Sequence, residues 1–226
     1  ISNFVFSSTA AIFGLGAGNG MSIDEDCVKS PINPYGRSKL AIEEVLEDFS
    51  KANSDFNFVA LRYFNACGAD LKVRTGECHD PETHLIPLAI RAAMNNGVMK
   101  IFGDDYETFD GTCVRDYIHV SDLAQIHVLA LGYLLDGNKS DYFNCGYNKG
   151  FSVRQIINEV KQVVGDDFKI ALESRRVGDP DVLVADNKKL INTYLSSMKN
   201  RNNLSTIIIG NVLKETYKKN NYCRNK

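Results

Sequence analysis

The sequence predicts an α/β fold built on a parallel sheet. Short apolar runs, such as residues 4–6 and 56–62, alternate along the chain with stretches whose apolar residues recur about every 3.6 positions. The run over 56–62 is apolar without alternation, as expected of a strand that helices cover on both faces of a parallel sheet. With 226 residues, 44% hydrophobic and 24% charged, the chain can bury a core in one or two domains.

The first strand, helix and strand form one βαβ unit. Residues 3–8 read as a buried strand. Asn33 is a preferred N-cap and Pro34 suits the first helical position, so a helix should begin there and run to about Ala52. Its apolar residues follow the helical period, and a second strand over 56–62 completes the unit.

The rest of the chain continues this alternation. A long loop over 63–82 comes first, and long loops inside compact domains are often functional. We expect helices over 84–96, 121–135, 152–164, 187–194 and 206–220, strands over 98–102, 112–120, 142–145 and 168–172, and a charged loop over 173–181.

Composition narrows the class of partner. A net charge of -2 and a pI near 6.1 give no general attraction to nucleic acid or to an anionic membrane, so we expect a small-molecule partner. No run of eighteen apolar residues occurs, and residues 1–6 are too short for a secretory signal. These observations predict a cytoplasmic protein.

We predict no metal site. The six cysteines, at positions 27, 67, 78, 113, 145 and 223, form no C-x-x-C pair and are expected to be reduced. His79 and His84, with Cys78 beside them, could join a metal site in principle, but they lie five residues apart in a loop rich in glycine, proline and acids.

The glycines over 14–20 do not form the dinucleotide-binding turn G-x-G-x-x-G. Its third glycine would fall on Asn19 if the motif began at Gly14, and on Met21 if it began at Gly16. No helix opens directly after these glycines to hold a pyrophosphate. We therefore predict a flexible surface loop.

Tyr35 and Lys39 are a candidate general base and its partner. Residues four apart on a helix share a face, so the ammonium can lie beside the phenol and stabilise its ionised form. Helices also carry this pair by chance on their surfaces, and the spacing alone does not separate the two interpretations.

Five blocks, in order, resemble the extended short-chain dehydrogenase/reductases. The first resembles the catalytic Ser/Thr strand end of that family, the second its Y-x-x-x-K helix and the third the segment beside nicotinamide and sugar. The fourth resembles a block whose arginine meets a nucleotide diphosphate, and the fifth a late loop over the nucleotide. They are residues 6–11, 33–39, 61–65, 111–120 and 175–179, and the resemblance covers residues 1 to about 190.

The resemblance implies the C-terminal half of a Rossmann-type doubly wound parallel sheet plus a smaller mixed α/β substrate-binding domain. Residues 1–65 would belong to the NAD-binding domain and 66–226 to the nucleotide-sugar-binding domain, with about 112–135 packing back on the first. The chain opens on a strand without a methionine. We therefore expect the N-terminal part of the NAD-binding domain to be missing, and expect this polypeptide alone to bind no NAD and to be inactive.

The implied activity is that of an isomerase of galactose metabolism: NAD-dependent C4 epimerisation of UDP-glucose and UDP-galactose. Tyr35 would act as the base, Lys39 would stabilise its phenolate, and Thr9 would bridge the sugar oxygen and Tyr35. A 4-keto sugar would form, rotate and be reduced on its other face. Thr9 could instead be a buried hydroxyl bonded to backbone.

The resemblance also implies the binding residues. Arg115 and Arg176 would hold the diphosphate. Asp179 would accept hydrogen bonds from ribose hydroxyls, and Phe102 would stack on uracil. The cofactor-binding residues would be Thr9, Tyr35, Lys39 and Phe64, and the substrate-binding residues Thr9, Tyr35, Asn65, His84, Leu85, Lys100, Ile101, Phe102, Arg115, Arg176 and Asp179.

The residues at positions 10, 11 and 183 narrow the choice of reaction and substrate. Dehydratase relatives carry an Asp-Glu pair directly after the threonine, and here Ala10 and Ala11 stand there, so elimination of water is disfavoured. The resemblance also places Leu183 at the family's pocket-wall position, where a large tyrosine would exclude an N-acetyl group, so we expect that N-acetylated UDP-hexosamines can be substrates as well.

Three alternatives stay open. The protein could be another NAD-dependent nucleotide-sugar epimerase, a nucleotide-sugar reductase, or a non-catalytic remnant that still binds nucleotide sugars. The segment over 196–226 departs from the family pattern, being rich in Asn and Lys. A homodimer is implied by the family.

Overall fold

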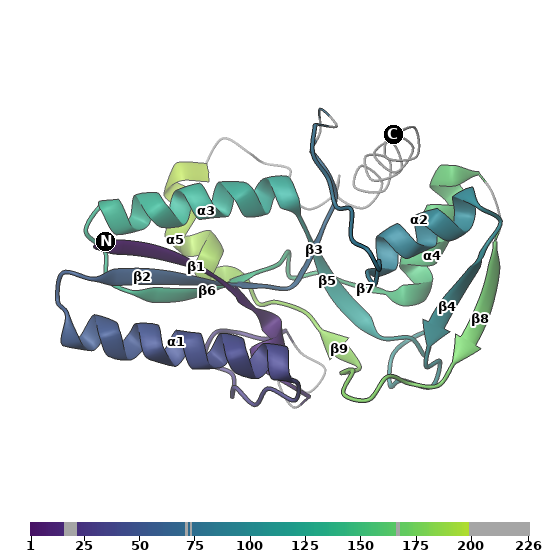
Figure 1. Cartoon of the computed structure of the whole chain (residues 1–226), viewed down its shortest axis with the longest axis horizontal. Coiled ribbons are helices and arrows are strands. Elements are labelled where there is room, and N and C mark those ends of the chain that lie inside the picture. The colour runs from purple at the N-terminus through teal and green to yellow at the C-terminus, as the bar shows by residue number, and fades with distance from the viewer. Residues whose placement is uncertain (16–21, 71, 73, 166–167, 199–226) are drawn as a thin grey trace.

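The computed structural model describes residues 1–15, 22–70, 72, 74–165 and 168–198. Its elements alternate between strand and helix as expected and gather in two lobes joined by a central strand (Figure 1). The predicted helix over 206–220 lies outside the described residues.

A parallel sheet of three strands forms the first lobe. Its order is β1 (Asn3–Thr9), β2 (Asn57–Tyr63) and β6 (Asp141–Cys145). Because Thr9 pairs with Tyr63 and Tyr63 with Cys145, the carboxyl ends of all three strands meet at one edge. Ligands of open α/β sheets commonly bind at this edge.

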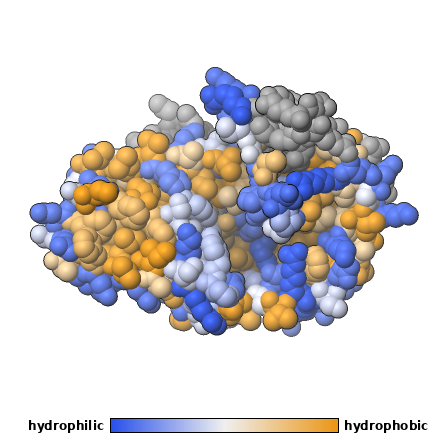
Figure 2. Space-filling model, in the orientation of Figure 1, coloured by the Kyte–Doolittle hydropathy of each residue, from blue (hydrophilic) through white to orange (hydrophobic). Residues whose placement is uncertain are grey.

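Helices cover both faces of this sheet, α1 (Pro34–Ala52) on one and α3 (Val120–Leu135) on the other (Figure 1). The Asn33 side chain accepts a hydrogen bond from the Gly36 N–H at 2.7 Å and so fixes the start of α1. Figure 2 shows apolar surface gathered over the lobe that carries β1, α1 and α3. Exposed apolar side chains there include Phe4, Val45 and Val128.

The second lobe pairs two helices with a short parallel ribbon. Helix α2 (Leu85–Met94) packs on α4 (Val153–Val164), and β4 (Val98–Phe102) pairs with β8 (Lys169–Glu173). Ser152 and Gln155 form a capping box at the start of α4, within one residue of the start of the helix expected over 152–164. The core between these elements includes Ile90, Met99, Ile101, Ile156 and Phe168.

Strand β5 (Val114–His119) joins the lobes. It is buried along its whole length and pairs in parallel with β3 (Asn65–Cys67) and β9 (Val182–Leu183), and antiparallel with β7 (Gly150–Ser152). Three of these strands have only two or three residues, too short for a pattern of apolar residues to reveal, and the sequence did not predict them.

Two further differences concern boundaries. Helix α3 begins one residue earlier than expected, because the His119 ring accepts a hydrogen bond from the Ser121 N–H at 3.0 Å and acts as the N-cap. Strand β6 also joins the first sheet, and α5 (Lys188–Met198) packs against it, so more of the chain returns to this lobe than 112–135. The boundary near residue 65 stays a prediction.

Among the described residues, no helix combines the length and the apolar character needed to cross a membrane.

Candidate functional site

Thr9, Tyr35 and Lys39 are brought to the carboxyl edge of the first sheet. Thr9 ends β1 and caps the 3-10 turn η1 (Ala10–Ile12), whereas Tyr35 and Lys39 lie in the first two turns of α1. Contact between α1 and η1 holds the helix start beside the strand end. The predicted catalytic trio therefore belongs to one edge of one sheet.

Lys39 lies beside the Tyr35 ring, as its spacing predicts. Its Nζ is 5.8 Å from the centre of that ring and donates a hydrogen bond to the Ser7 carbonyl at 2.9 Å. Tyr35 is 56% exposed, so its phenol is open to a ligand from solvent. The arrangement suits a base that faces a bound molecule rather than a core contact.

Thr9 is buried, and its hydroxyl oxygen accepts a hydrogen bond from the Ala11 N–H at 3.2 Å. This is the backbone contact that the alternative interpretation of Thr9 expected. A hydroxyl also carries one donor hydrogen and a second lone pair, so the contact leaves Thr9 able to donate to a ligand.

The helix that carries Tyr35 and Lys39 is anchored by a buried ion pair that the sequence did not reveal. Glu43, two turns further along α1, accepts from Arg62 Nε at 3.0 Å and from Arg62 Nη2 at 2.8 Å. Ser8 donates to the same carboxylate at 2.6 Å. Because Ser8 precedes Thr9 on β1 and Arg62 precedes Tyr63 on β2, the pair fixes α1 against the two strand ends.

Tyr63 forms a second polar group at this edge, again unpredicted. Its hydroxyl donates to Ser7 Oγ at 2.7 Å and contacts His127 Nε2. His127 in turn contacts the Leu123 carbonyl through Nδ1 at 2.7 Å. Burial raises the pKa of Tyr63 to about 12, so this phenol stays protonated and donates near neutral pH.

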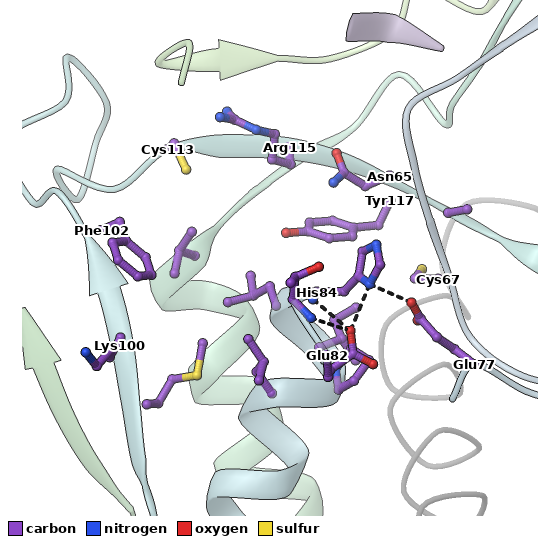
Figure 3. Close-up of a pocket in the computed structure, with 18 of the residues that line it drawn as sticks. Asn65, Cys67, Glu77, Glu82, His84, Lys100, Phe102, Cys113, Arg115 and Tyr117 are labelled. Atoms are coloured by element: carbon purple, nitrogen blue, oxygen red, sulfur yellow. Dashed lines mark hydrogen bonds and ion pairs between the residues drawn. The ribbon is translucent and has the colours of Figure 1, made fainter. Parts of the chain in front are cut away.

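A cavity of about 490 Å³ lies between the central strand β5 and the second lobe (Figure 3). Its size is that of a small-molecule site. All predicted substrate-binding residues except Thr9, Tyr35 and Ile101 line it. Tyr117 from β5 and Cys113, which directly precedes that strand, also contribute to its wall, and the sequence singled out neither.

Two arginines and one aspartate contribute charge to the cavity wall near β5. Arg115 is buried on β5, with Nη1 donating to the carbonyls of Val114 and Pro180 at 2.8 Å each, and its Nη2 lies 3.5 Å from Asp179. Arg176 is on the loop between β8 and β9. Fixed guanidinium groups are suited to phosphate oxygens.

The predicted uracil-contacting strand, β4, divides between cavity and core. Lys100 and Phe102 line the cavity, while Ile101 points into the core of the second lobe. A role for Ile101 in binding would therefore fall to its backbone. The guanidinium of Arg176 lies 4.0 Å from the centre of the Phe102 ring, and Lys100 pairs with Glu173 at 2.9 Å.

Phe64 and Asn65 follow β2 but take different places. Asn65 lines the cavity. Phe64 is 7% exposed and belongs to the same buried cluster as Ala10 and Ile12. Its side chain thus supports the turn after Thr9, and its predicted contact with a cofactor stays a prediction.

A close approach of backbone connects the cavity to the sheet edge that carries Tyr35 and Lys39. Gly178, with a φ of +86°, lies so near the Ile32 side chain that an added Cβ would be 2.8 Å from its Cδ1. Ile32 directly precedes the N-cap of α1, and Gly178 lies between Arg176 and Asp179. The loop of the cavity and the start of the Tyr35 helix are therefore neighbours.

Comparisons with known proteins agree with this geometry. A model of the NAD dependent epimerase/dehydratase family matches residues 1–146. A UDP-glucose 4-epimerase of Rhizobium meliloti (strain 1021) is 48% identical over 190 residues, which are 84% of this chain and 57% of that protein.

Two solved structures extend the likeness. UDP-glucose 4-epimerase from Brucella ovis in complex with NAD matches with a TM-score of 0.84 and 41% identity, over 95% of this chain and 63% of that one. The UDP-Glc/GlcNAc 4-epimerase from Campylobacter jejuni matches with a TM-score of 0.75 and 41% identity, over 98% and 65%.

The chain spans 57% of the length of the curated relative named above. Within its own length, the family match covers the βαβ unit, the Tyr35 helix and the central strand β5. The family resemblance drawn from the sequence is thus confirmed, and the chain belongs to the NAD dependent epimerase/dehydratase family.

Proposed function

We propose that the protein containing this chain is a UDP-glucose 4-epimerase that interconverts UDP-glucose and UDP-galactose with NAD. The observation that carries the proposal is the Tyr35–Lys39 pair, open to solvent at the carboxyl edge of a parallel sheet and joined through Gly178 to an arginine-lined cavity. Relatives of 48% and 41% identity with this activity support it.

The residues of the sheet edge fit the nicotinamide-ribose end of NAD. The Tyr35 phenol is exposed at the carboxyl edge of the sheet and the Lys39 ammonium lies beside its ring, so both would be available to ribose hydroxyls. When bound, NAD accepts a hydride from C4 of the sugar and returns it.

Tyr35 handles the proton that accompanies this hydride. Its phenolate takes the proton of the sugar 4-hydroxyl as C4 is oxidised to a ketone, and gives it back when C4 is reduced. The Lys39 ammonium stabilises the phenolate, and Thr9 donates a hydrogen bond to the sugar oxygen. Inversion requires the keto sugar to turn its other face to the same edge before reduction.

The cavity holds the UDP group while the sugar turns. Arg115 and Arg176 bind the diphosphate, Asp179 accepts from the ribose, and Phe102 offers its ring to uracil. His84, Leu85, Lys100 and Asn65 complete the wall. Anchoring the nucleotide in the cavity would allow the sugar ring to rotate without release of the substrate.

Epimerisation fits better than elimination of water. An acid and a base beyond Tyr35 would be needed to remove the water, and the two positions after Thr9 hold Ala10 and Ala11. Ala10 is buried, and it packs in the cluster that includes Phe64. The two positions that would supply the further acid and base in a dehydratase therefore carry methyl groups here.

The test is turnover of UDP-galactose by the complete gene product that carries these residues. Tyr35→Phe should lower kcat by about 10²–10⁴-fold, the usual contribution of a positioned acid or base. Tyr133→Phe is a matched control. Tyr133 lies on α3, which covers the opposite face of the sheet from α1, and its ring packs against Phe143 and Tyr194.

Three results would count against this function. Equal turnover by Tyr35→Phe would remove Tyr35 as the base. Turnover of a different nucleotide sugar, with none of UDP-galactose, would favour another enzyme of the family. Binding of UDP without turnover of any UDP-hexose would favour a non-catalytic nucleotide-sugar-binding protein.

We also infer that the protein forms a homodimer. Ile42, Val45 and Phe49 are exposed along one face of α1, and their apolar surface suits burial against a second copy. Val45→Glu should shift the complete gene product toward monomer in light scattering coupled to size exclusion, with Glu44→Gln as the control. An unchanged mass for Val45→Glu would place any interface elsewhere.

A further inference from the structure

Two short sequence units meet at one end of the cavity. Residues 77–79 and 82–84 each read Glu-x-His, and the loop between them folds back so that all four side chains face one another. Their donor atoms all lie within 4.8 Å of one another. Figure 3 shows Glu77, Glu82 and His84 pointing together, on the side of the cavity away from Lys100 and Phe102.

The cluster contains more hydrogen-bond acceptors than donors. His84 Nδ1 lies 2.6 Å from Glu77 Oε1 and 2.8 Å from Glu82 Oε1, and His79 Nδ1 lies 3.0 Å from the same Glu77 oxygen. A ring nitrogen carries at most one proton, so Nδ1 of His84 cannot donate fully to both carboxylates.

Glu82 adds an independent sign of a missing partner. Its side chain is only 1% exposed. Its Oε1 accepts from the N–H groups of Thr83 and His84 at 2.8 and 2.9 Å, which fixes the orientation of the carboxylate, but its Oε2 is buried without any hydrogen-bond partner. A buried, unpaired carboxylate oxygen is costly, and a ligand would relieve it.

No basic side chain supplies that relief. Among the described residues, neither lysine nor arginine forms an ion pair with Glu77 or Glu82, and His79 and His84 are the only side chains paired with them. The cluster therefore brings two carboxylates and two imidazoles together without a lysine or arginine to balance the negative charge of the carboxylates. Two imidazole nitrogens and two carboxylate oxygens are a common ligand set for zinc and similar ions.

We propose that Glu77, His79, Glu82 and His84 bind one divalent transition-metal ion of the zinc class. Four donor atoms that each lie about 2.0–2.2 Å from one metal ion are a few ångströms from one another. The four donor atoms of this cluster lie within 4.8 Å of one another, so they are close enough to share one ion. The backbone N–H groups on Glu82 Oε1 orient the carboxylate as outer partners of metal ligands commonly do.

This proposal departs from the prediction of no metal made from the sequence. That prediction weighed His79 and His84 with Cys78, whereas the fold supplies Glu77 and Glu82 as the other ligands. Cys78 is not in the cluster. The proposal does not depend on the proposed function, and a metal on Nδ1 of His84 leaves Nε2 of that ring as a donor toward the cavity.

The test is titration of the complete gene product, freed of metal by a chelator, with Zn²⁺ in a calorimeter and with Co²⁺ in an absorption spectrometer. We expect one ion per chain, and for Co²⁺ the visible bands of a tetrahedral site without the charge-transfer band of a thiolate. Glu77→Gln and His79→Asn should each weaken binding by at least about tenfold, since even outer partners of metal ligands contribute 10–100-fold.

The variants are chosen so that folding does not confuse the result. His79 is largely exposed, with its side chain 60% accessible, so His79→Asn removes a ligand without opening the core. Glu82→Gln is a second variant, checked by circular dichroism because Glu82 also supports the start of α2. Cys78→Ser and Glu44→Gln are the matched controls and should bind as the parent does.

Two outcomes would overturn the proposal. One is the absence of stoichiometric binding of Zn²⁺ and Co²⁺ by the folded parent protein. The other is binding that Glu77→Gln and His79→Asn leave unchanged, or that Cys78→Ser abolishes, because the metal would then be held by other residues.

Discussion

The Glu43 carboxylate receives two parallel hydrogen bonds from the Arg62 guanidinium, at 3.0 and 2.8 Å, and both side chains are almost fully buried. The Arg62 guanidinium also lies over the rings of Phe13 and Tyr142, 5.4 and 4.6 Å from their centres. The pair therefore ties α1 to the sheet through charge, hydrogen bonding and packing together.

Glu43→Ala should destabilise the protein by about 3–5 kcal/mol, because it leaves the Arg62 charge buried without its partner. The measurement is urea unfolding of the complete gene product. Glu44→Ala, the next residue and an exposed one, is the control and should change the free energy of unfolding by less than about 0.5 kcal/mol. Equal unfolding midpoints for the two variants would show that Glu43 does not anchor α1.

Lys39→Met should lower kcat for UDP-galactose by about 10²–10⁴-fold while leaving the protein folded, because it removes the ammonium beside the Tyr35 ring. Lys39 has a second contact, to the Ser7 carbonyl, so circular dichroism should accompany the kinetics. Arg37→Met, on the same helix, is the control. A Lys39→Met enzyme as fast as the parent would contradict the proposed role.

Leu183→Tyr should reduce turnover of UDP-N-acetylglucosamine relative to UDP-glucose by at least about tenfold, since added bulk in a pocket discriminates at this scale. Leu183 pairs in register with Arg115 on β5, which places it next to the cavity wall. Leu183→Met preserves the size and should leave the ratio unchanged. If the parent enzyme turns over no UDP-N-acetylglucosamine, the proposed wider substrate range is wrong.

Asp116 should make stability depend on pH. Burial raises the pKa of its carboxyl to about 6, although its oxygens accept from the N–H groups of Tyr147, Asn148 and Ala185 at 2.9–3.2 Å. Because the folded pKa lies above the unfolded value of about 4, the stabilisation from Asp116 is complete below about pH 4. It is lost as the pH rises through about 6.

Urea unfolding of the parent and of Asp116→Asn between pH 4 and 7 checks this relation. The parent should lose on the order of 3 kcal/mol relative to the variant over that interval. Asp104→Asn, in an exposed loop, is the control and should follow the parent. Parallel curves for parent and Asp116→Asn would contradict the shifted pKa.

Much of the fold followed from local patterns. The cap at Asn33 with Pro34 predicted the residue where α1 begins, and the helix expected over 152–164 agrees with α4 to within one residue, because caps depend on neighbours in sequence. Strands β3, β7 and β9 were missed, because their pairing with β5 depends on residues far away in the chain.

The site shows the same division. Tyr35 and Lys39 could be paired from helical spacing, and the cavity residues from family blocks. Glu43, Arg62 and the Tyr63–Ser7 contact could not, because a buried charge or phenol has no sequence pattern of its own. The four residues of the proposed metal site come together only when the loop over 77–84 folds back on itself.

Because the Arg176 guanidinium is stacked on Phe102, one face of this aromatic ring in the cavity is already covered. If uracil stacks on the same face of Phe102, this guanidinium has to move away and gives up a contact of about 0.5–1 kcal/mol at an exposed site. The diphosphate that arrives with the base offers the same guanidinium a stronger partner. Arg176 then exchanges its contact with the Phe102 ring for a contact with the diphosphate as the ligand binds. The base and the diphosphate should therefore bind better together than either does alone.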